Sequence, residues 1–331
     1  MNQCPSLYKQ HQGTGFCNKA LKMLFGGRKV STYLNFDAPE YLFDNAFASN
    51  IQQISISGVQ LKHSLRLIGN HLQLTQSGGE YLLKPIPIGR FQHLDFAPEN
   101  EHLTMQIASQ VFGIETASNA LIYFKNSEPA YLVKRFDIRD DGAKWLQEDF
   151  SQIKQVSRQQ NGENYKYEGS YEAIARLIQQ YCAAWPIELE NFFKLLIFNY
   201  LFSNGDAHLK NFSLIQTPFD DFRLTPAYDL LCTAVHTPLE SVMALDLFDN
   251  DYFTDSYNVL GYYSYADFYE FGIKIGILPQ RTEKIIHTLS SHSDLVQQMI
   301  DNSFLPSSIK HLYWQQYQSR LDALTYRITN N

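Results

Sequence analysis

The stretch "SNGDAHLKNFSLI", residues 203–215, decides the fold. It places Asp206, His208 and Asn211 directly after the longest apolar run of the chain, which we expect to be a buried helix. A loop can bring a carboxylate and an amide oxygen at this spacing into one pocket. Kinase catalytic loops use the same spacing for a base (Asp) and a magnesium ligand (Asn). The stretch therefore predicts a catalytic loop of the kinase type.

The segment after this loop adds a second carboxylate. "FSLI" and "FRL" are predicted to form two short strands around the turn "TPFDD", and Asp229 follows the second strand. Mg²⁺ prefers oxygen ligands and keeps waters and phosphates in the rest of its shell, so one carboxylate and one amide are a sufficient protein contribution. Asp229 is therefore the predicted metal ligand beside Asn211.

Three residues earlier in the chain meet the remaining needs of such a site. Lys84 ends the strand "EYLLK", and Glu101 opens a helix expected over residues 101–112. A lysine there can bind phosphates, and a carboxylate can hold that lysine in place. Gly58 in "SISGVQ" would let the backbone approach the phosphates closely, although taken alone this glycine is better explained as a strand bulge.

Each of these residues has an ordinary explanation by itself. Asp206 and Asn211 are typical turn residues that cap backbone N–H groups. Glu101 in the first turn of a helix is explained by the helix dipole. Their order is less ordinary, because the glycine, the lysine, the helix carboxylate, a connecting strand, the catalytic loop and the last aspartate follow one another as two lobes require. The ordered set favours phosphoryl transfer over a chance arrangement.

The remaining pattern predicts an α+β, two-lobed, protein-kinase-like fold, with a small β-rich N-terminal lobe (1–137) and a larger helical C-terminal lobe (138–331). In the first lobe, apolar and polar residues alternate in "ISISGVQLKHSLRLIG", and the segment from there to "GGEYLLKPI" has the length of a hairpin connection. "SNALIYF" and "PAYLVKRFD" are two further strands joined by a polar turn. The predicted helices of the second lobe are 171–184, 188–203 and several stretches from Tyr265 onward.

Composition excludes several classes of protein. The 331 residues are 44% hydrophobic and carry a formal net charge of -7, so the chain has no global basic field with which to bind DNA alone. Four cysteines make no disulfide framework, and the start of the chain shows no signal-peptide core. We therefore expect a cytoplasmic protein that does not enter a membrane.

Several motifs together resemble one family, the HipA-like serine/threonine kinases, which are toxins of bacterial toxin–antitoxin systems. The matching stretches run in order from about Ser55 to Leu231: "SGVQLK", "YLLKP", "ENEHLTM", "YLVKRFD", "LQEDFSQ", "NGDAHLKN" and "LTPAYDLL". "DAHLKN" and "TPAYD" are distinctive of that family rather than of kinases in general. The glycine loop carries Ser55 and Ser57, and the separate N-terminal subdomain of long HipA proteins is expected to be missing. Both features resemble the short HipT type.

The resemblance implies a role for each matching residue. Lys84 would bind the phosphates of ATP with Glu101 orienting it, and Asp206 would accept the substrate proton with His208 supporting its loop. Ser55 and Ser57 would be autophosphorylated as a form of regulation. The remaining implied sites are the nucleotide-binding residues Ser55, Ser57, Gly58, Lys134, Phe136, Asp137 and Gln147, with adenine at the backbone of 133–136, and the Mg²⁺ ligands Asn211 and Asp229.

The same resemblance implies substrates and partners. The substrate would be a serine of an aminoacyl-tRNA synthetase of the tryptophanyl or glutamyl type, whose phosphorylation stops translation. The partners would be antitoxins, namely a small DNA-binding HipB-like protein and a HipS-like protein. The expected location is the bacterial cytoplasm, or a host cytosol if the protein is secreted as an effector.

Two other functions stay open at this point. The chain could be a catalytically silent, ATP-binding component of a DNA-bound repressor complex, although Asp206, Asn211 and Asp229 are all intact. It could also be a small-molecule kinase, since these enzymes share the Asp-to-Asn spacing.

Overall fold

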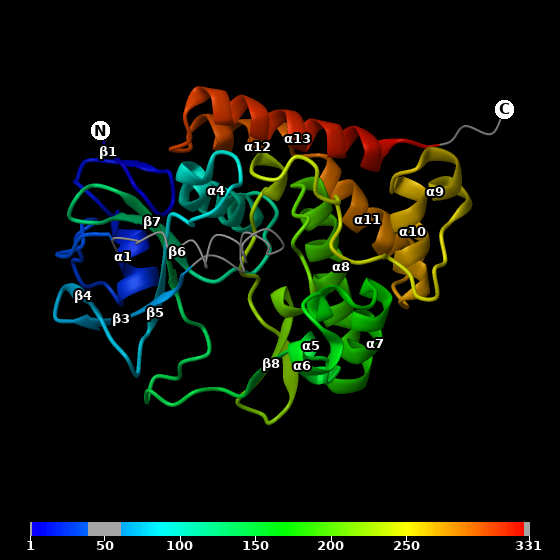
Figure 1. Ribbon diagram of the computed structural model, residues 1–331, viewed down its shortest axis with the longest axis horizontal. Helices are drawn as coiled ribbons and strands as arrows, with labels where there is room; N and C mark the ends of the chain where they lie inside the picture. The colour runs from blue at the N-terminus through cyan, green and yellow to red at the C-terminus, as the bar shows by residue number, and fades with distance from the viewer. Residues whose placement is uncertain (1, 39–60, 328–331) are drawn as a thin grey trace.

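The computed structural model describes residues 2–38 and 61–327. These residues form two parts: a sheet with one helix packed on it, and a larger helical part beside it (Figure 1). Helix α4 lies between the two parts, and α12 and α13 run along the top (Figure 1). Ser55, Ser57 and Gly58 lie outside the described residues. The two-part α+β arrangement confirms the predicted fold class.

The sheet of the first part has five strands, all antiparallel, in the order β4-β3-β5-β7-β6. Four of these strands agree with the sequence prediction. The segment expected to be a plain hairpin connection contains the additional strand β4, which pairs with β3 from Leu65–Leu74 to Ile68–His71. The strands are β3 (His63–Ile68), β4 (His71–Leu74), β5 (Tyr81–Pro85), β6 (Asn119–Tyr123) and β7 (Pro129–Lys134).

The N-terminal segment covers one face of this sheet. Strands β1 (Asn2–Gln3) and β2 (Gln10–His11) pair with each other and precede helix α1 (Asn18–Phe25). Apolar side chains of α1 pack in one buried cluster with those of β3, β5, β6 and β7. Tyr81 on β5 donates a hydrogen bond to the carbonyl of Leu24 (2.7 Å). The segment is therefore part of the folded core.

Helix α4 (Ala97–Gln110) covers the other face and begins four residues before the predicted start at Glu101. Its first turn contains a proline, which suits a position where no backbone N–H is needed. Apolar residues of α4 belong to the same core cluster as those of the long helix α8 (Trp185–Leu201), which was expected at 188–203. Two of the buried polar side chains of α4 bond to distant segments of the chain. Asn100 donates to the carbonyl of Cys232 (3.0 Å), and Thr104 shares a hydrogen bond with Tyr313 (2.9 Å).

The second part consists of helices around a small sheet of order β10-β9-β8. Among the residues that the structure describes, no helix is long and apolar enough to cross a membrane. The sheet is formed by β8 (Gln147–Asp149), β9 (Ser213–Gln216) and β10 (Phe222–Leu224). The helices are α5 (Phe150–Ile153), α6 (Arg158–Asn161), α7 (Tyr171–Tyr181), α8, α9 (Asp255–Leu260), α10 (Tyr265–Lys274), α11 (Pro279–Ser290), α12 (Ser293–Asp301) and α13 (Ser307–Thr325). Short 3₁₀ turns are η2 (Leu94–Phe96), η3 (Tyr165–Tyr167), η4 (Leu209–Asn211) and η5 (Thr233–Val235).

The buried carboxyl group of Glu99 on α4 should make stability depend on pH. Burial raises its pKa to about 7, and its Oε2 atom has no hydrogen-bond partner within the described ranges. Because the folded-state pKa is raised, the ionised group destabilises the fold increasingly as pH rises from 4.5 through 7. Glu99→Gln should leave the free energy of unfolding nearly unchanged at pH 4 and raise it by up to roughly 3 kcal/mol at pH 8, measured by urea denaturation. The exposed Glu148→Gln is the control, and equal effects of Glu99→Gln at both pH values would contradict the expectation.

Candidate active site

The centre of the site is a buried ammonium between two carboxylates. Lys84 on β5 contacts Glu101 Oε1 on α4 (2.6 Å) and Asp229 Oδ1 in the segment after β10. The Lys84 side chain is 3% exposed, and its ammonium lies 5.4 Å from the ring centroid of Tyr131 on the neighbouring strand β7. Three residues that are far apart in the sequence thus meet at one point.

This ion bridge fixes the charge of its members. Burial by itself would lower the pKa of Lys84, but Asp229 and Glu101 raise it above its usual range. Burial would likewise raise the pKa of Asp229, but the ammonium groups of Lys62 and Lys84 lower it below its usual range. The lysine is therefore a cation and the aspartate an anion at any pH near neutrality.

The backbone around Asp229 is held in an unusual conformation. Its φ angle is 54°, in the left-handed region that a non-glycine residue seldom adopts, and such residues cluster at functional sites. Ala227 accepts a hydrogen bond from Ala117 N (3.0 Å) and donates one to the carbonyl of Glu115 (2.8 Å). Asn204 Nδ2 donates to the carbonyl of Asp229 (3.4 Å). Contacts with both parts of the molecule thus position the carboxylate.

Asp206 lies on a tightly packed loop after α8. The preceding Gly205 leaves no room for a side chain, because a Cβ there would collide with the backbone oxygen of Ser241. The Asp206 side chain is only 6% exposed. Its Oδ1 accepts a hydrogen bond from the Tyr167 hydroxyl (2.6 Å) and lies 3.8 Å from Lys166 Nζ.

Lys166 and Tyr167 are site residues that the sequence did not reveal. They belong to the 3₁₀ turn η3, in the segment "NYKYEG" between α6 and α7. Burial lowers the pKa of Lys166 while Asp206 opposes that change. A lysine beside tyrosines in a polar segment forms no motif, so only the folded chain shows that this turn lies on the catalytic loop.

His208 is buried beside Asp206. Its Nε2 atom lies 3.6 Å from Asp206 Oδ1, and its ring makes an edge contact with Tyr167 (centroids 5.3 Å apart). Burial lowers the pKa of His208 to about 4, so the ring is neutral at pH 7. Neither ring nitrogen has a hydrogen-bond partner in the part of the chain that is described. The ring therefore packs under the loop as a neutral group.

The donor set fits a nucleotide-held Mg²⁺. The Oδ1 atom of Asn211 is buried without a hydrogen-bond partner among the described residues, which leaves an oxygen available for a cation. The loop that carries it is tied to the Asp229 segment, because Tyr228 OH donates to the carbonyl of Lys210 (2.9 Å). Residues 2–38 and 61–327 contain no group of three or more His, Cys, Asp or Glu side chains that could hold a metal by themselves. Such a set suits a hard cation whose other ligands are phosphates and water.

The residues expected to bind the adenosine moiety lie between the end of β7 and the start of β8. Lys134 ends β7, and Gln147 begins β8, where it pairs with Ile215. Phe136 packs near Tyr228, with ring centroids 5.9 Å apart. Asp137 accepts hydrogen bonds from Arg135, one of them at 2.9 Å from Nε. The carboxylate predicted to reach a ribose is thus paired with a neighbouring arginine here.

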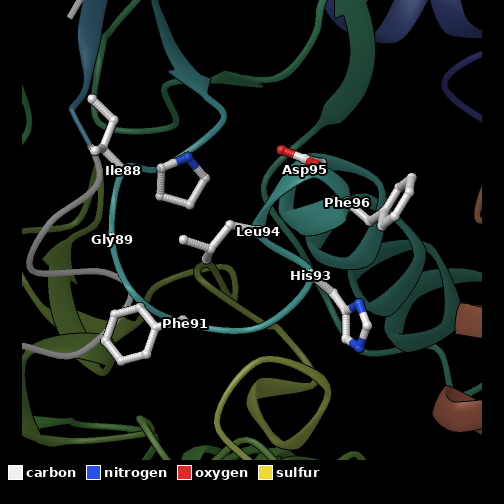
Figure 2. Close-up of a pocket in the computed structure, with 8 residues that line it drawn as sticks. Ile88, Gly89, Phe91, His93, Leu94, Asp95 and Phe96 are labelled. Carbon is white, nitrogen blue, oxygen red and sulfur yellow. The ribbon is translucent and has the colours of Figure 1, made fainter.

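A cavity of about 580 Å³ lies on the loop that joins the strand of Lys84 to the helix of Glu101. Figure 2 shows Ile88, Phe91 and Leu94 around the hollow, with His93 and Asp95 on the η2 side of the loop. Its eight described lining residues include no lysine or arginine. The described lining therefore offers no ammonium or guanidinium group, and among the described residues a buried cation lies instead at Lys84.

Removing the central ammonium should destabilise the fold. Lys84→Met leaves the buried carboxylate of Glu101 without a cation and leaves Asp229 with Lys62 alone, and breaking a buried ion pair costs about 3–5 kcal/mol. The double variant Lys84→Met/Glu101→Gln should recover part of this loss, because the unpaired charge of Glu101 is gone. Urea denaturation at pH 7 measures both, with the exposed Lys144→Met as control. Additive losses in the double variant would show that the groups do not interact.

Comparisons with known proteins show which family and which fold this chain resembles. The family model of the HipA-like C-terminal domain matches residues 54–297. A Haemophilus influenzae protein named "Putative kinase" is 28% identical over 341 residues, which cover 96% of this chain and 95% of that protein. The serine/threonine-protein kinase toxin HipA of Shewanella oneidensis is 27% identical over 214 residues, which cover 60% of this chain and 47% of the toxin.

Two solved structures share the fold. HipA of Shewanella oneidensis, in a complex with HipB and operator DNA, has a TM-score of 0.60 at 22% identity and covers 88% of this chain and 74% of its own. The Helicobacter pylori proinflammatory kinase CtkA has a TM-score of 0.52 at 14% identity and covers 78% of this chain and 93% of its own. Together with the matched family model, these likenesses confirm the resemblance expected from the motifs, and the chain belongs to the HipA-like C-terminal domain family, with its kinase-like fold.

Proposed function

We propose that this protein is a serine/threonine protein kinase that uses ATP and Mg²⁺ to phosphorylate a serine of another protein. The observation that carries the proposal is the buried bridge of Lys84 with Glu101 and Asp229. It presents one fixed cation and one fixed anion at the same point, as phosphate binding and metal binding require. Positioning and neutralisation of charge supply most of the catalysis in phosphoryl transfer.

In this proposal each side chain has a separate task. Lys84 would bind the phosphates and Glu101 would hold its ammonium, while Asp229 and Asn211 would be the protein ligands of the metal. Bound Mg²⁺ would supply neutralisation of the phosphate charge. Asp206 would accept the proton of the substrate hydroxyl, and the buried, neutral His208 would support its loop without changing the local charge.

The turn η3 adds a positioning function to this scheme. A proton acceptor must be aligned with the incoming hydroxyl, and small displacements are costly. The hydrogen bond from Tyr167 OH to Asp206 Oδ1 (2.6 Å) restricts rotation of the carboxylate. Lys166, 3.8 Å from the same oxygen, keeps a positive charge beside the reaction centre.

The biological setting in the proposal is a toxin–antitoxin system. It is supported by the Shewanella oneidensis toxin, whose solved structure includes HipB and operator DNA. By the HipT-type resemblance, the substrate would be an aminoacyl-tRNA synthetase of the tryptophanyl or glutamyl type, and the partners would be HipB-like and HipS-like antitoxins. Autophosphorylation of Ser55 or Ser57, which lie outside the described residues, would regulate the kinase.

Loss of the proposed base or metal ligand should abolish phosphoryl transfer. Asp206→Asn and Asp229→Asn should each lower labelling by at least about a thousandfold, since they remove proton acceptance or charge neutralisation. Purified protein is incubated with radiolabelled ATP, Mg²⁺ and a bacterial extract, and the labelled serines are mapped by mass spectrometry. Asp220→Asn is the matched control, because Asp220 also has a positive φ but lies at an exposed turn.

Each outcome of this experiment decides a part of the proposal. Label on one extract protein and on Ser55 or Ser57 would support the protein kinase with its regulation. ATP binding without any label would refute the catalytic function. Growth arrest by the wild type but not by Asp206→Asn would connect toxicity with the chemistry, and equal arrest by both would separate them.

Removing the Tyr167 hydroxyl should slow the chemical step without weakening nucleotide binding. Tyr167→Phe keeps the ring and its contact with His208 but loses the hydrogen bond to Asp206, so kcat should fall about tenfold. The dissociation constant of ATP should stay unchanged. Single-turnover kinetics and equilibrium binding measure the two effects, with Tyr181→Phe, 45% exposed, as the control. A loss confined to ATP affinity would exclude the positioning function.

A further inference from the structure

Lys62 brings a second ammonium to Asp229. Its Nζ lies 3.5 Å from Asp229 Oδ2, while Lys84 contacts Oδ1 of the same carboxylate. Lys62 ends the motif "SGVQLK", and the proposed mechanism gives this lysine no task. Both oxygens of the proposed metal ligand are therefore paired with lysines.

The two lysines differ in how firmly they are held. Lys84 is 3% exposed and is shared with Glu101 at 2.6 Å, so its removal would leave buried charges unpaired. Lys62 is 39% exposed and makes a longer contact from a flexible four-carbon stem. Water can replace its contact with Asp229 at small cost. Of the two lysines, Lys62 is thus the one that can move away from Asp229.

The positive and negative side chains in the described ion pairs around Asp229 are equal in number. Lys62 and Lys84 together carry as much positive charge as Glu101 and Asp229 carry negative charge. A divalent cation that enters alone must approach Asp229 against the nearby Lys62 ammonium, and like charges at such distances repel. A triphosphate that enters with the cation offers the displaced ammonium new anionic partners.

We propose that Lys62 occupies the metal-binding side of Asp229 in the nucleotide-free protein and transfers to the phosphates when nucleotide and metal bind together. The proposal rests on the proposed function insofar as Asp229 is the metal ligand. Lys62 then acts as a positioning residue that couples the two ligands. The metal alone binds weakly, and by linkage the nucleotide tightens metal binding by the same factor by which the metal tightens nucleotide binding.

Mn²⁺ is a suitable probe, because its free concentration is measured by electron paramagnetic resonance without any enzymatic turnover. Lys62→Met should bind Mn²⁺ alone about tenfold more tightly than the wild type, since it removes the competing charge. Lys62→Arg keeps the charge and should bind as weakly as the wild type. Asp229→Asn, introduced into Lys62→Met, should remove the gain, and the exposed Lys144→Met should have no effect.

A second titration tests the coupling itself. With a non-hydrolysable ATP analogue present, the wild type should gain more Mn²⁺ affinity from the nucleotide than Lys62→Met gains, by about the same tenfold. The proposal is overturned if Lys62→Met binds Mn²⁺ no more tightly than Lys144→Met, if the gain persists without Asp229, or if none of the proteins binds Mn²⁺. Tighter Mn²⁺ binding in a protein that shows no phosphoryl transfer would refute the kinase function while supporting this inference, so the two failures are distinguishable.

Discussion

The ammonium of Lys84 is buried between carboxylates that come from a helix and from a loop distant in sequence, and the arrangement of the molecule depends on that contact. A buried charge without its partner costs several kcal/mol, whereas the complete set offsets most of its own desolvation. The strand, the helix and the loop must therefore come together, because the charge on each one can be buried only when the other two are present. The same requirement that joins the two parts of the fold also creates a site for an anionic ligand and a cation.

Helix α4 is the element that makes this contact rigid. It is buried along most of its length although many of its side chains are polar, and these polar groups bond to both parts of the molecule. His102, for example, shares a hydrogen bond with Tyr8 of the N-terminal segment (2.7 Å), while Thr104 bonds to Tyr313 on α13. Glu101 directly precedes His102 on the same helix. Because these contacts involve no ligand, the position of Glu101 is set by the fold itself, and the phosphate site that we propose would be preorganised.

The sequence singled out candidate site residues where they follow short spacings or strand patterns. Asp206 and Asn211 lie on one loop, and Lys84 and Asp229 each follow a strand pattern, so local order was sufficient to single them out. Contacts made by exposed or irregular segments cannot be recognised from short spacings or strand patterns in the sequence. The pairing of Lys62 with Asp229 and of η3 with the catalytic loop arises from packing between distant segments. The early start of α4 was missed for a related reason, because Glu99 and its neighbours are polar yet buried, and their pattern does not show a helical face.

The two aspartates of the site are restrained in different ways. In the proposed mechanism Asp229 binds the metal, whereas Asp206 accepts a proton in the chemical step. Asp229 is restrained by ammonium groups and by a strained backbone, so its charge and direction are set before a ligand arrives. Asp206 is restrained by the hydroxyl of Tyr167, a neutral donor from a turn outside the family motifs that we identified. In the proposed kinase, a protein substrate would bring its hydroxyl to Asp206 beside that turn. In the proposed kinase, Lys84, Asp229 and Asn211 would therefore hold the transferred group, and the segment from α6 to α7 would help to select the hydroxyl that receives it.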